Sequence, residues 1–250
     1  MAKIIRPGQA MTGRETVVFV HIPKTAGSTL NAVMDANYAA DQIAQVDSPV
    51  RESVGHLCAL DPGQQAQLRV VRGHGTMNLH RSWGNPCVYI TLLRDPVDRV
   101  VSQYYFLKAS QSHPLGTQLR DESIGIEQYV EGEMNLQIDN GQVRALSAMG
   151  NGVGEDVAFG DCRDAMLDTA TRAIDNDFYF VGLQEAFEAS LERLSALMSW
   201  TLLDVDRKKV TRDRPGVEAL PASTRKLIVS RNALDSALYL HAKKRFEAGC

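Results

Sequence analysis

The fold is decided near the N-terminus, by the stretch Thr16-Val-Val-Phe-Val-His-Ile-Pro-Lys-Thr-Ala-Gly-Ser-Thr-Leu30. Its first residues are β-branched and aromatic, which is typical of a buried strand, and this strand is expected to end at His21. From Ser28 to Tyr38 the apolar residues recur at helical spacing, and Ser28 is expected to be the N-cap. The stretch therefore predicts a strand, a loop and a helix in succession.

A second strand signal lies at Cys87–Leu93, where the run of apolar residues is nearly continuous. Parallel sheets use such runs when helices cover both of their faces, so this strand is expected to be central. Asp95 follows as the expected cap of a helix that has Pro96 at its first position and ends near Lys108.

The rest of the chain alternates between strand and helix patterns. Further strands are predicted at Leu68–Arg72 and Asp177–Gly182, and Ala39–Gly63 has the composition of a variable, turn-rich segment. Further helices are predicted at Glu127–Met149, Asp164–Ile174 and Glu185–Trp200, and as a pair between Ala222 and Phe246. The alternation predicts a three-layer α/β fold, with a central parallel sheet, helices on both faces and a P-loop-like nucleotide site. The 250 residues are expected to form one domain, with residues 1–14 as a flexible tail.

Composition limits the partners that the chain can have. Charged residues make up 23% and hydrophobic ones 44%, which is ordinary for a soluble globular protein. The net charge of −3 argues against nucleic acid as a partner, so an anionic ligand would need a local basic site. The four cysteines lie far apart without zinc-ligand spacing, and no metal is expected. Without a signal-peptide pattern or a run of about 20 apolar residues, the sequence predicts no membrane span and a cytoplasmic location.

The loop between the first strand and helix has the character of an anion site, because backbone N–H groups and the helix dipole favour negative charge there. Lys24 adds positive charge, Gly27 allows close backbone approach, and Thr25, Ser28 and Thr29 supply hydroxyls. The lysine comes three residues before the glycine, so the Walker A pattern of ATP and GTP hydrolases is absent. The alternative is a capped turn with a solvated lysine.

A second candidate site begins at Arg94, which leaves the carboxyl end of the predicted central strand, where open α/β sheets bind ligands. Ser102 comes four residues after Asp98 on the following helix, so its hydroxyl can face the same edge. An arginine fork with a hydroxyl suits a terminal phosphate. The alternative is that Arg94 simply pairs with Asp95 or Asp98.

Together, these two segments resemble the sulfotransferases that depend on 3′-phosphoadenosine 5′-phosphosulfate (PAPS), closest to the heparan-sulfate 2-O-sulfotransferase-like branch and similar bacterial proteins. The resemblance extends to Asn135–Gly150, Val181–Glu185 and Asn232–Tyr239. It implies in-line transfer of the sulfuryl group from PAPS to an acceptor hydroxyl, without a metal. It also implies that the first loop holds the 5′-phosphosulfate and the second segment the 3′-phosphate. The residues so implied are Lys24, Thr25, Ala26, Gly27, Ser28, Thr29, Arg94 and Ser102.

His74 is the candidate general base. It stands between two glycines after a predicted strand, so its imidazole can reach the same sheet edge as Lys24. An imidazole with a pKa near 6.5 suits proton removal from an attacking hydroxyl, and the resemblance supports this role. Lys24 would then stabilise charge on the leaving phosphate oxygen. His21 is either a packed or orienting group or the next candidate for the base.

A basic loop, Arg207–Pro215, places five cations in nine residues. Such a run is usually a solvated surface, but the resemblance implies a loop that closes over the nucleotide, with contacts from Lys209, Thr211 and Arg212. Trp83 and Tyr104 are candidates for lining an acceptor pocket or, equally, for packing.

The acceptor is expected to be a hydroxyl of a carbohydrate, with a lipid, a small metabolite or a peptide tyrosine as alternatives, and the oligomeric state is not indicated. Two other functions stay open. A nucleotide or small-molecule kinase should show Walker A and an acidic magnesium ligand, and neither is evident. A non-catalytic nucleotide- or glycan-binding relative need not keep Lys24 together with His74.

Overall fold

The computed structural model describes residues 3–147, 157–202 and 215–249. Within these residues the strands form one sheet, in the order β2-β3-β1-β4-β5, and every neighbouring pair is parallel. The strands are β1 (Thr16–Val20), β2 (Ile43–Val46), β3 (Val70–Gly73), β4 (Cys87–Leu93) and β5 (Phe178–Leu183). The predicted parallel α/β fold is confirmed.

Two of the inner strands, β1 and β4, are the ones with the strongest sequence signal. Every residue of both is buried, and they pair from Thr16 and Cys87 through to Val20 and Thr91. β1 is the middle strand, and β4 lies between it and β5. Continuous apolar runs thus occupy the strands that helices cover on both faces.

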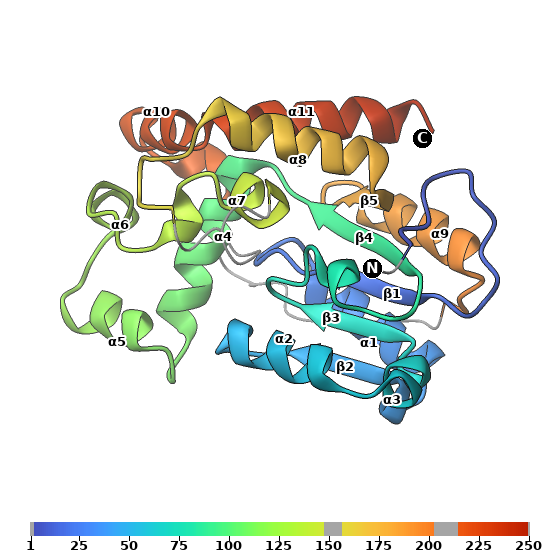
Figure 1. Ribbon diagram of the computed structural model, residues 1–250. Helices are drawn as coiled ribbons and strands as arrows, with labels where there is room; N and C mark the ends of the chain where they lie inside the picture. Colours follow the sequence, from blue (N-terminus) through green and yellow to red (C-terminus); the bar gives the residue numbers. More distant parts are fainter. Residues whose placement is uncertain (1–2, 148–156, 203–214, 250) are drawn as a thin grey trace.

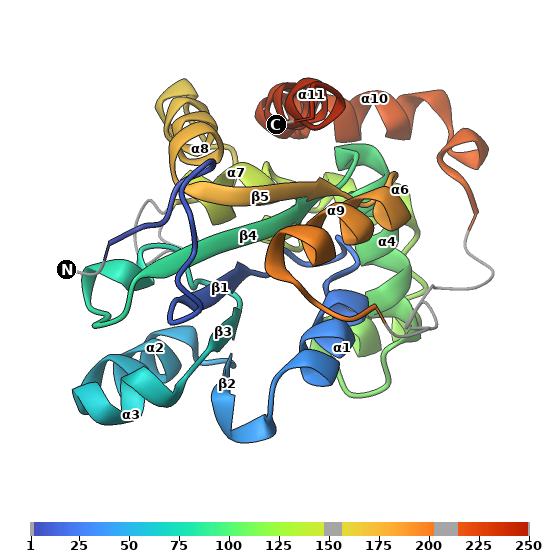
Figure 2. The ribbon, with the colours of Figure 1, turned by 90° about the vertical axis from the view of Figure 1, so that its right-hand side faces the viewer.

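Helices lie on both faces of the sheet, as Figure 2 shows with α1 and α9 on one side and α2, α3 and α8 on the other. The helices among the described residues are α1 (Gly27–Asn37), α2 (Val50–Ala59), α3 (Pro62–Gln67), α4 (Pro96–Ala109), α5 (Pro114–Asp121), α6 (Ile126–Glu131), α7 (Gly141–Ser147), α8 (Asp164–Asn176), α9 (Phe187–Met198), α10 (Ala222–Arg231) and α11 (Ala233–Glu247). Short 3-10 turns are η1 (Ala40–Gln42), η2 (Leu79–Arg81), η3 (Leu136–Ile138) and η4 (Val217–Ala219). None of the described helices is long and apolar enough to cross a membrane.

The helices α4 to α7 gather beyond the carboxyl ends of the strands (Figure 1). They carry a second apolar cluster, centred on Val100, Leu107 and Tyr129, beside the main core along the sheet. Asp95 caps α4 as predicted, since its carboxylate accepts from the backbone N–H groups of Val97 and Asp98. Helices therefore cover the carboxyl edge of the sheet. The first of them, α4, begins at the Asp95 cap that follows β4.

Several sequence-based expectations need correction. The segment 39–63 contains the edge strand β2 and the helix α2, whose polar and small residues gave a weak pattern. The single helix expected at 127–149 is divided into α6, η3 and α7, with Glu133 and Asn140 in left-handed conformations at the breaks. The expected free tail at 1–14 is also wrong in part, because Ile5 is buried and its N–H donates to Cys87 O over 2.9 Å.

Candidate active site

The loop between β1 and α1 has an unusual backbone. Lys24 and Ala26 have φ values of 71° and 70°, whereas Thr25 between them lies outside the positive region. Residues with a Cβ are strained there, and such strain is concentrated at functional sites. Alternation of this kind turns successive N–H groups toward one concave surface that suits an anion. Ala26, not Ser28, occupies the N-cap position of α1, without a side-chain hydrogen bond.

Gly27 is needed at the start of α1 because of His21. A Cβ at Gly27 would lie 2.2 Å from Cδ2 and Nε2 of the His21 ring. That ring stacks between Phe19 and His74, with centroid distances of 5.2 and 4.9 Å. The close approach predicted at Gly27 is therefore to a histidine of the same loop, and His21 is a packed, orienting group.

His74 is exposed at the end of β3, and its Nδ1 lies 2.6 Å from the backbone O of His21. A carbonyl oxygen only accepts, so Nδ1 carries the proton and the lone pair of the neutral ring is on Nε2. The preceding Gly73 has a φ of 143°, and a Cβ there would meet Val46 O at 2.3 Å. Glycine before His74 thus lets β3 turn close to β2 and bring the imidazole beside the loop.

The three hydroxyls of the loop differ in their surroundings. Thr25 is fully buried and its Oγ1 donates to Ile22 O over 2.9 Å, so this side chain holds the loop closed. Thr29 is also buried, on the inner side of α1, whereas Ser28 is half-buried. Of the three loop hydroxyls, the one on Ser28 is thus the most exposed.

The Lys24 side chain lies against α4. Its Nζ is 3.8 Å from the centroid of the Phe106 ring, an aromatic side chain that is 39% exposed. A cation over a ring face at this distance gains a moderate electrostatic attraction. The contact therefore joins the β1–α1 loop to α4.

Arg94 joins the same loop to the start of α4. Its Nη1 donates to Lys24 O over 2.8 Å, and its Nε and Nη2 both contact Asp98 Oδ2. The alternative in which Arg94 pairs with Asp98 is therefore the arrangement in the structure. Ser102, one turn beyond Asp98, is buried on the same side of α4. The structure thus brings Arg94, Ser102 and Lys24 to one edge of the sheet.

The backbone at Arg94 is held by two side chains that carried no signal in the sequence. Gln142 is fully buried; its Oε1 accepts from Arg94 N over 3.0 Å and its Nε2 donates to Arg94 O over 2.9 Å. Glu185 accepts from Asp95 N over 2.8 Å and from the Tyr239 hydroxyl over 2.8 Å. The amide and the carboxylate lie 48 and 90 residues along the chain, too far for a spacing motif to reveal them.

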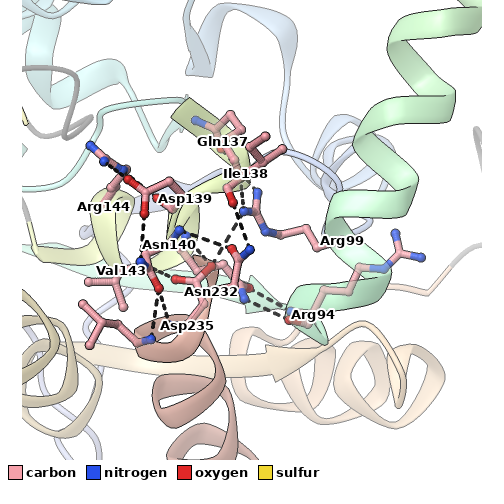
Figure 3. A network of polar contacts seen from close by, with 12 residues as sticks. Arg94, Arg99, Gln137, Ile138, Asp139, Asn140, Val143, Arg144, Asn232 and Asp235 are labelled. Atoms are coloured by element: carbon pink, nitrogen blue, oxygen red, sulfur yellow. Dashed lines mark hydrogen bonds and ion pairs between the residues drawn. The ribbon is translucent and has the colours of Figure 1, made fainter. Parts of the chain in front are cut away.

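Behind Arg94 is a buried polar network, in which α11 meets α7 and α4 (Figure 3). Asp235 accepts from the N–H groups of Gln142 and Val143 over 3.0 and 2.7 Å, and Arg99 lies 3.7 Å away. Asn140 Oδ1 accepts from Asp235 N over 3.1 Å. Burial raises the pKa of the Asp235 carboxyl, while Arg99 and the two N–H donors act in the opposite direction. The segments around Asn140, Asn232 and Asp235 singled out in the sequence are thus structural supports of the Arg94 turn.

Two other groups of expected residues do not join this site. Lys209, Thr211 and Arg212 lie outside the described residues. Trp83 is buried and donates to Thr16 Oγ1, at the amino end of β1, and the Tyr104 hydroxyl is buried against Ile124 O. Packing is therefore the role of both aromatic side chains. Among the described residues, no group of His, Cys, Asp or Glu is arranged to hold a metal ion.

Comparison with known proteins places the chain in a family. No curated protein sequence matches it. Among solved structures, the mouse sulfotransferase SULT7A1 complexed with PAP is similar at 16% identity and a TM-score of 0.43, over 76% of this chain and 61% of that chain. This chain thus spans about three fifths of the length of that protein's chain. The sequence model of the galactose-3-O-sulfotransferases matches residues 2–248, nearly the whole chain. The chain therefore belongs to the galactose-3-O-sulfotransferase family.

Proposed function

We propose that the protein transfers the sulfuryl group of PAPS to a hydroxyl of a carbohydrate, with His74 as the general base. The observation that carries this proposal is the contact between His74 Nδ1 and His21 O at 2.6 Å. In the tautomer that this contact selects, the lone pair is on Nε2, the ring nitrogen turned away from the backbone, at an exposed histidine beside the Lys24 loop. This is the protonation state that a base needs before it accepts a proton.

In the proposed reaction, His74 Nε2 accepts the proton of the acceptor hydroxyl while its oxygen attacks sulfur. The new bond from oxygen to sulfur forms as the bond from sulfur to the 5′-phosphate oxygen breaks, and adenosine 3′,5′-bisphosphate (PAP) leaves. Lys24 and the N–H groups between Lys24 and Gly27 stabilise the charge that develops on the leaving oxygen. Charges and dipoles fixed before the reaction supply much of the rate in such transfers.

The other end of the donor is assigned to Arg94 and Ser102. Arg94 has five N–H donors, of which Asp98 and Lys24 O engage three, so the fork can take a phosphate oxygen without leaving the loop. Ser102 lies one turn after Asp98 on the same side of α4 and supplies a hydroxyl. A nucleotide bridging these two groups and the β1–α1 loop would span the carboxyl edge of the sheet, where open α/β folds bind nucleotides.

The acceptor class comes from the family, whose name specifies O3 of galactose. We infer that the acceptor is a galactoside, and that sulfuryl transfer needs no bound metal because the charge is met by Lys24 and backbone dipoles. The cytoplasmic location inferred from the sequence stays a prediction.

The proposal is tested by comparing His74→Ala with the wild type for transfer of labelled sulfuryl from PAPS to lactose. Loss of the base should lower kcat by about 10²–10⁴-fold, because proton transfer contributes this much. Calorimetry should give the same Kd for PAP within about twofold, since His74 is not assigned to the nucleotide.

His56→Ala, an exposed histidine of α2, is the matched control and should leave both measurements unchanged. Near-normal turnover in a folded His74→Ala protein would contradict the assignment of the base. Failure of the wild type to bind PAP would contradict the sulfotransferase mechanism itself.

A further inference from the structure

Phe106 is an aromatic side chain of α4 that lies outside the hydrophobic core. It is 39% exposed and belongs to neither apolar cluster, whereas its neighbour Leu107 is part of the second cluster and Tyr105 packs against it. A single exposed apolar side chain is common on protein surfaces. Phe106 differs in its partner, because the ammonium of Lys24 lies 3.8 Å from the centroid of its ring. The ring therefore contacts a charged group of the candidate active site.

Phe106 lies on the side of α4 that meets the β1–α1 loop. Asp98, Ser102 and Phe106 follow one another at intervals of four residues, which places them along one side of the helix. Asp98 pairs with Arg94, whose Nη1 donates to Lys24 O over 2.8 Å. Lys24 is therefore held from this side of α4 at two points, at its carbonyl oxygen through Arg94 and at its ammonium by Phe106.

The two contacts fix different parts of Lys24. The hydrogen bond from Arg94 holds the main chain, which has a φ of 71° at this residue. A lysine side chain is long and flexible, so a fixed carbonyl oxygen does not determine where the ammonium lies. The contact with Phe106 restricts the ammonium to the space over one ring face. A charge that is placed before the reaction stabilises the transition state without the cost of reorganisation.

An aromatic ring suits this task better than an acidic side chain. A carboxylate would attract the ammonium more strongly, but it would also cancel much of the charge that the leaving oxygen needs. The negative face of a ring attracts a cation and leaves its full charge in place. The ammonium has three N–H donors, so it can lie over the ring and still donate to oxygen atoms of the phosphosulfate.

We propose that Phe106 is a positioning residue, whose ring holds the ammonium of Lys24 toward the oxygen that leaves sulfur. The inference rests on the proposed function, and it adds a hydrocarbon ring to a site otherwise built from charges, hydroxyls and backbone dipoles. The competing interpretation is that the exposed ring is a surface for the acceptor sugar. The two differ in their kinetics, because loss of a positioned Lys24 lowers kcat, whereas loss of an acceptor contact raises the KM for the acceptor.

The test changes the electrostatics of the ring and leaves its shape nearly unchanged. Phe106 is replaced in turn by phenylalanines with one, two and three ring fluorines, each of which withdraws more negative charge from the ring face. The kcat for transfer from PAPS to lactose should fall stepwise along this series, and by about three- to thirtyfold in Phe106→Leu, which has no ring. The KM for lactose should stay within about twofold of the wild type. Phe106→Trp should keep most of the activity, because indole is the strongest cation-binding ring.

Phe246→Leu is the matched control. It removes a ring of α11 that lies 4.2 Å from the guanidinium carbon of Arg193 on α9, so the same kind of contact is lost outside the site. It should lower the melting temperature and leave kcat unchanged. The contact itself is measured by NMR on lysine-labelled protein, in which the ring should shift the ε-CH₂ protons of Lys24 upfield in the wild type but not in Phe106→Leu. Melting temperatures establish that each variant is folded.

The outcomes separate this inference from the proposed function. A kcat that does not vary with fluorination in folded proteins would overturn the role of Phe106 while the sulfotransferase mechanism stands. A raised KM for lactose at constant kcat would overturn it in favour of an acceptor surface. If the wild type binds PAP but does not accept lactose, the same series is measured on the slow transfer of sulfuryl from PAPS to water, which releases the same leaving oxygen. If the wild type does not bind PAP, the proposed function is wrong and the role of Phe106 is wrong with it.

Discussion

The β1–α1 loop and the network around Asp235 use polar groups in opposite ways. The loop holds Lys24 and Ala26 at positive φ and leaves Ser28 and His74 accessible. In the network, Asp235 is fully buried and meets two N–H groups and a guanidinium. One region is strained and open to solvent, whereas the other is buried.

We interpret this difference as a division of roles: the β1–α1 loop binds the ligand, and the network around Asp235 holds that loop in place. Strain at a site persists only where the surrounding structure over-determines it, and here the surrounding structure includes Arg94, which donates to Lys24 O. Arg94 is in turn held at both backbone polar atoms by Gln142, whose own N–H donates to Asp235. The closed region therefore fixes the position of the open one through a single side-chain amide.

The largest effect on stability is expected from Asp235→Ala. It leaves Arg99, fully buried, without the nearest carboxylate, and removal of one partner from a buried pair typically costs about 3–5 kcal/mol of unfolding free energy. Urea denaturation measures this loss. Asp175→Ala is the control, because Asp175 pairs with His241 and Arg245 at the surface and should contribute about 1 kcal/mol or less. Equal losses of unfolding free energy in the two variants would contradict the claim that the buried Asp235 network stabilises the fold more than the surface ion pairs do.

The sequence predicted the strands and the class of enzyme well, because both depend on local pattern. The apolar run of β4, the Asp95 cap and the lysine loop after β1 are all contained in short segments, and membership of a sulfotransferase family is confirmed by the match over residues 2–248. The heparan-sulfate 2-O branch is not confirmed, since the matching family is that of the galactose-3-O enzymes.

The supporting residues could not be predicted, because their partners lie far away in the chain. Nothing around Gln142 indicates that its amide bonds Arg94. Asn140, whose positive φ interrupts the expected long helix, accepts from Asp235 N, which lies 95 residues away. Asn at a break in a helical pattern is a signal in retrospect, since it tolerates the left-handed region better than most residues.

A second, smaller effect is expected from Gln142→Leu. This variant tests whether the buried network positions Arg94 for binding the nucleotide. The variant leaves a buried N–H and C=O of Arg94 without partners, and each such group costs about 1–3 kcal/mol. Because Arg94 would then be poorly placed, PAP affinity should fall together with stability. Gln142→Glu keeps the acceptor for Arg94 N and should recover part of the PAP affinity. Reduced stability with an unchanged Kd for PAP would show that the network does not position Arg94.

A substitution that relieves strain in the β1–α1 loop should raise stability, in contrast to the two substitutions above. Ala26→Gly removes the steric cost of a Cβ at φ 70°, and the unfolding free energy should rise by about 1 kcal/mol. Ala196→Gly, in the exposed interior of α9, is the matched control and should lower it by about 0.5–1 kcal/mol. Thermal and urea denaturation compare the pair. A loss of stability in Ala26→Gly would mean that the loop stores no strain.

The smallest effect is expected at His80, which lies in η2, outside the proposed site. Its Nδ1 is 2.9 Å from the Tyr89 hydroxyl, which accepts from His80 N and so donates its own proton to the ring. Burial, with a smaller contribution from the charge of Arg81, lowers the pKa of the His80 imidazole below its usual value near 6.5. The unfolded chain then binds a proton at a higher pH than the folded one, so stability is full above about 6.5 and is lost as the pH falls through the folded pKa. His80→Gln should flatten this loss in denaturation curves between pH 5 and 7.5, yet leave the pH profile of kcat unchanged, because His80 is not part of the proposed site. A shifted pH profile of kcat in His80→Gln would show that His80 affects catalysis. It would contradict the claim that His80 contributes only to stability.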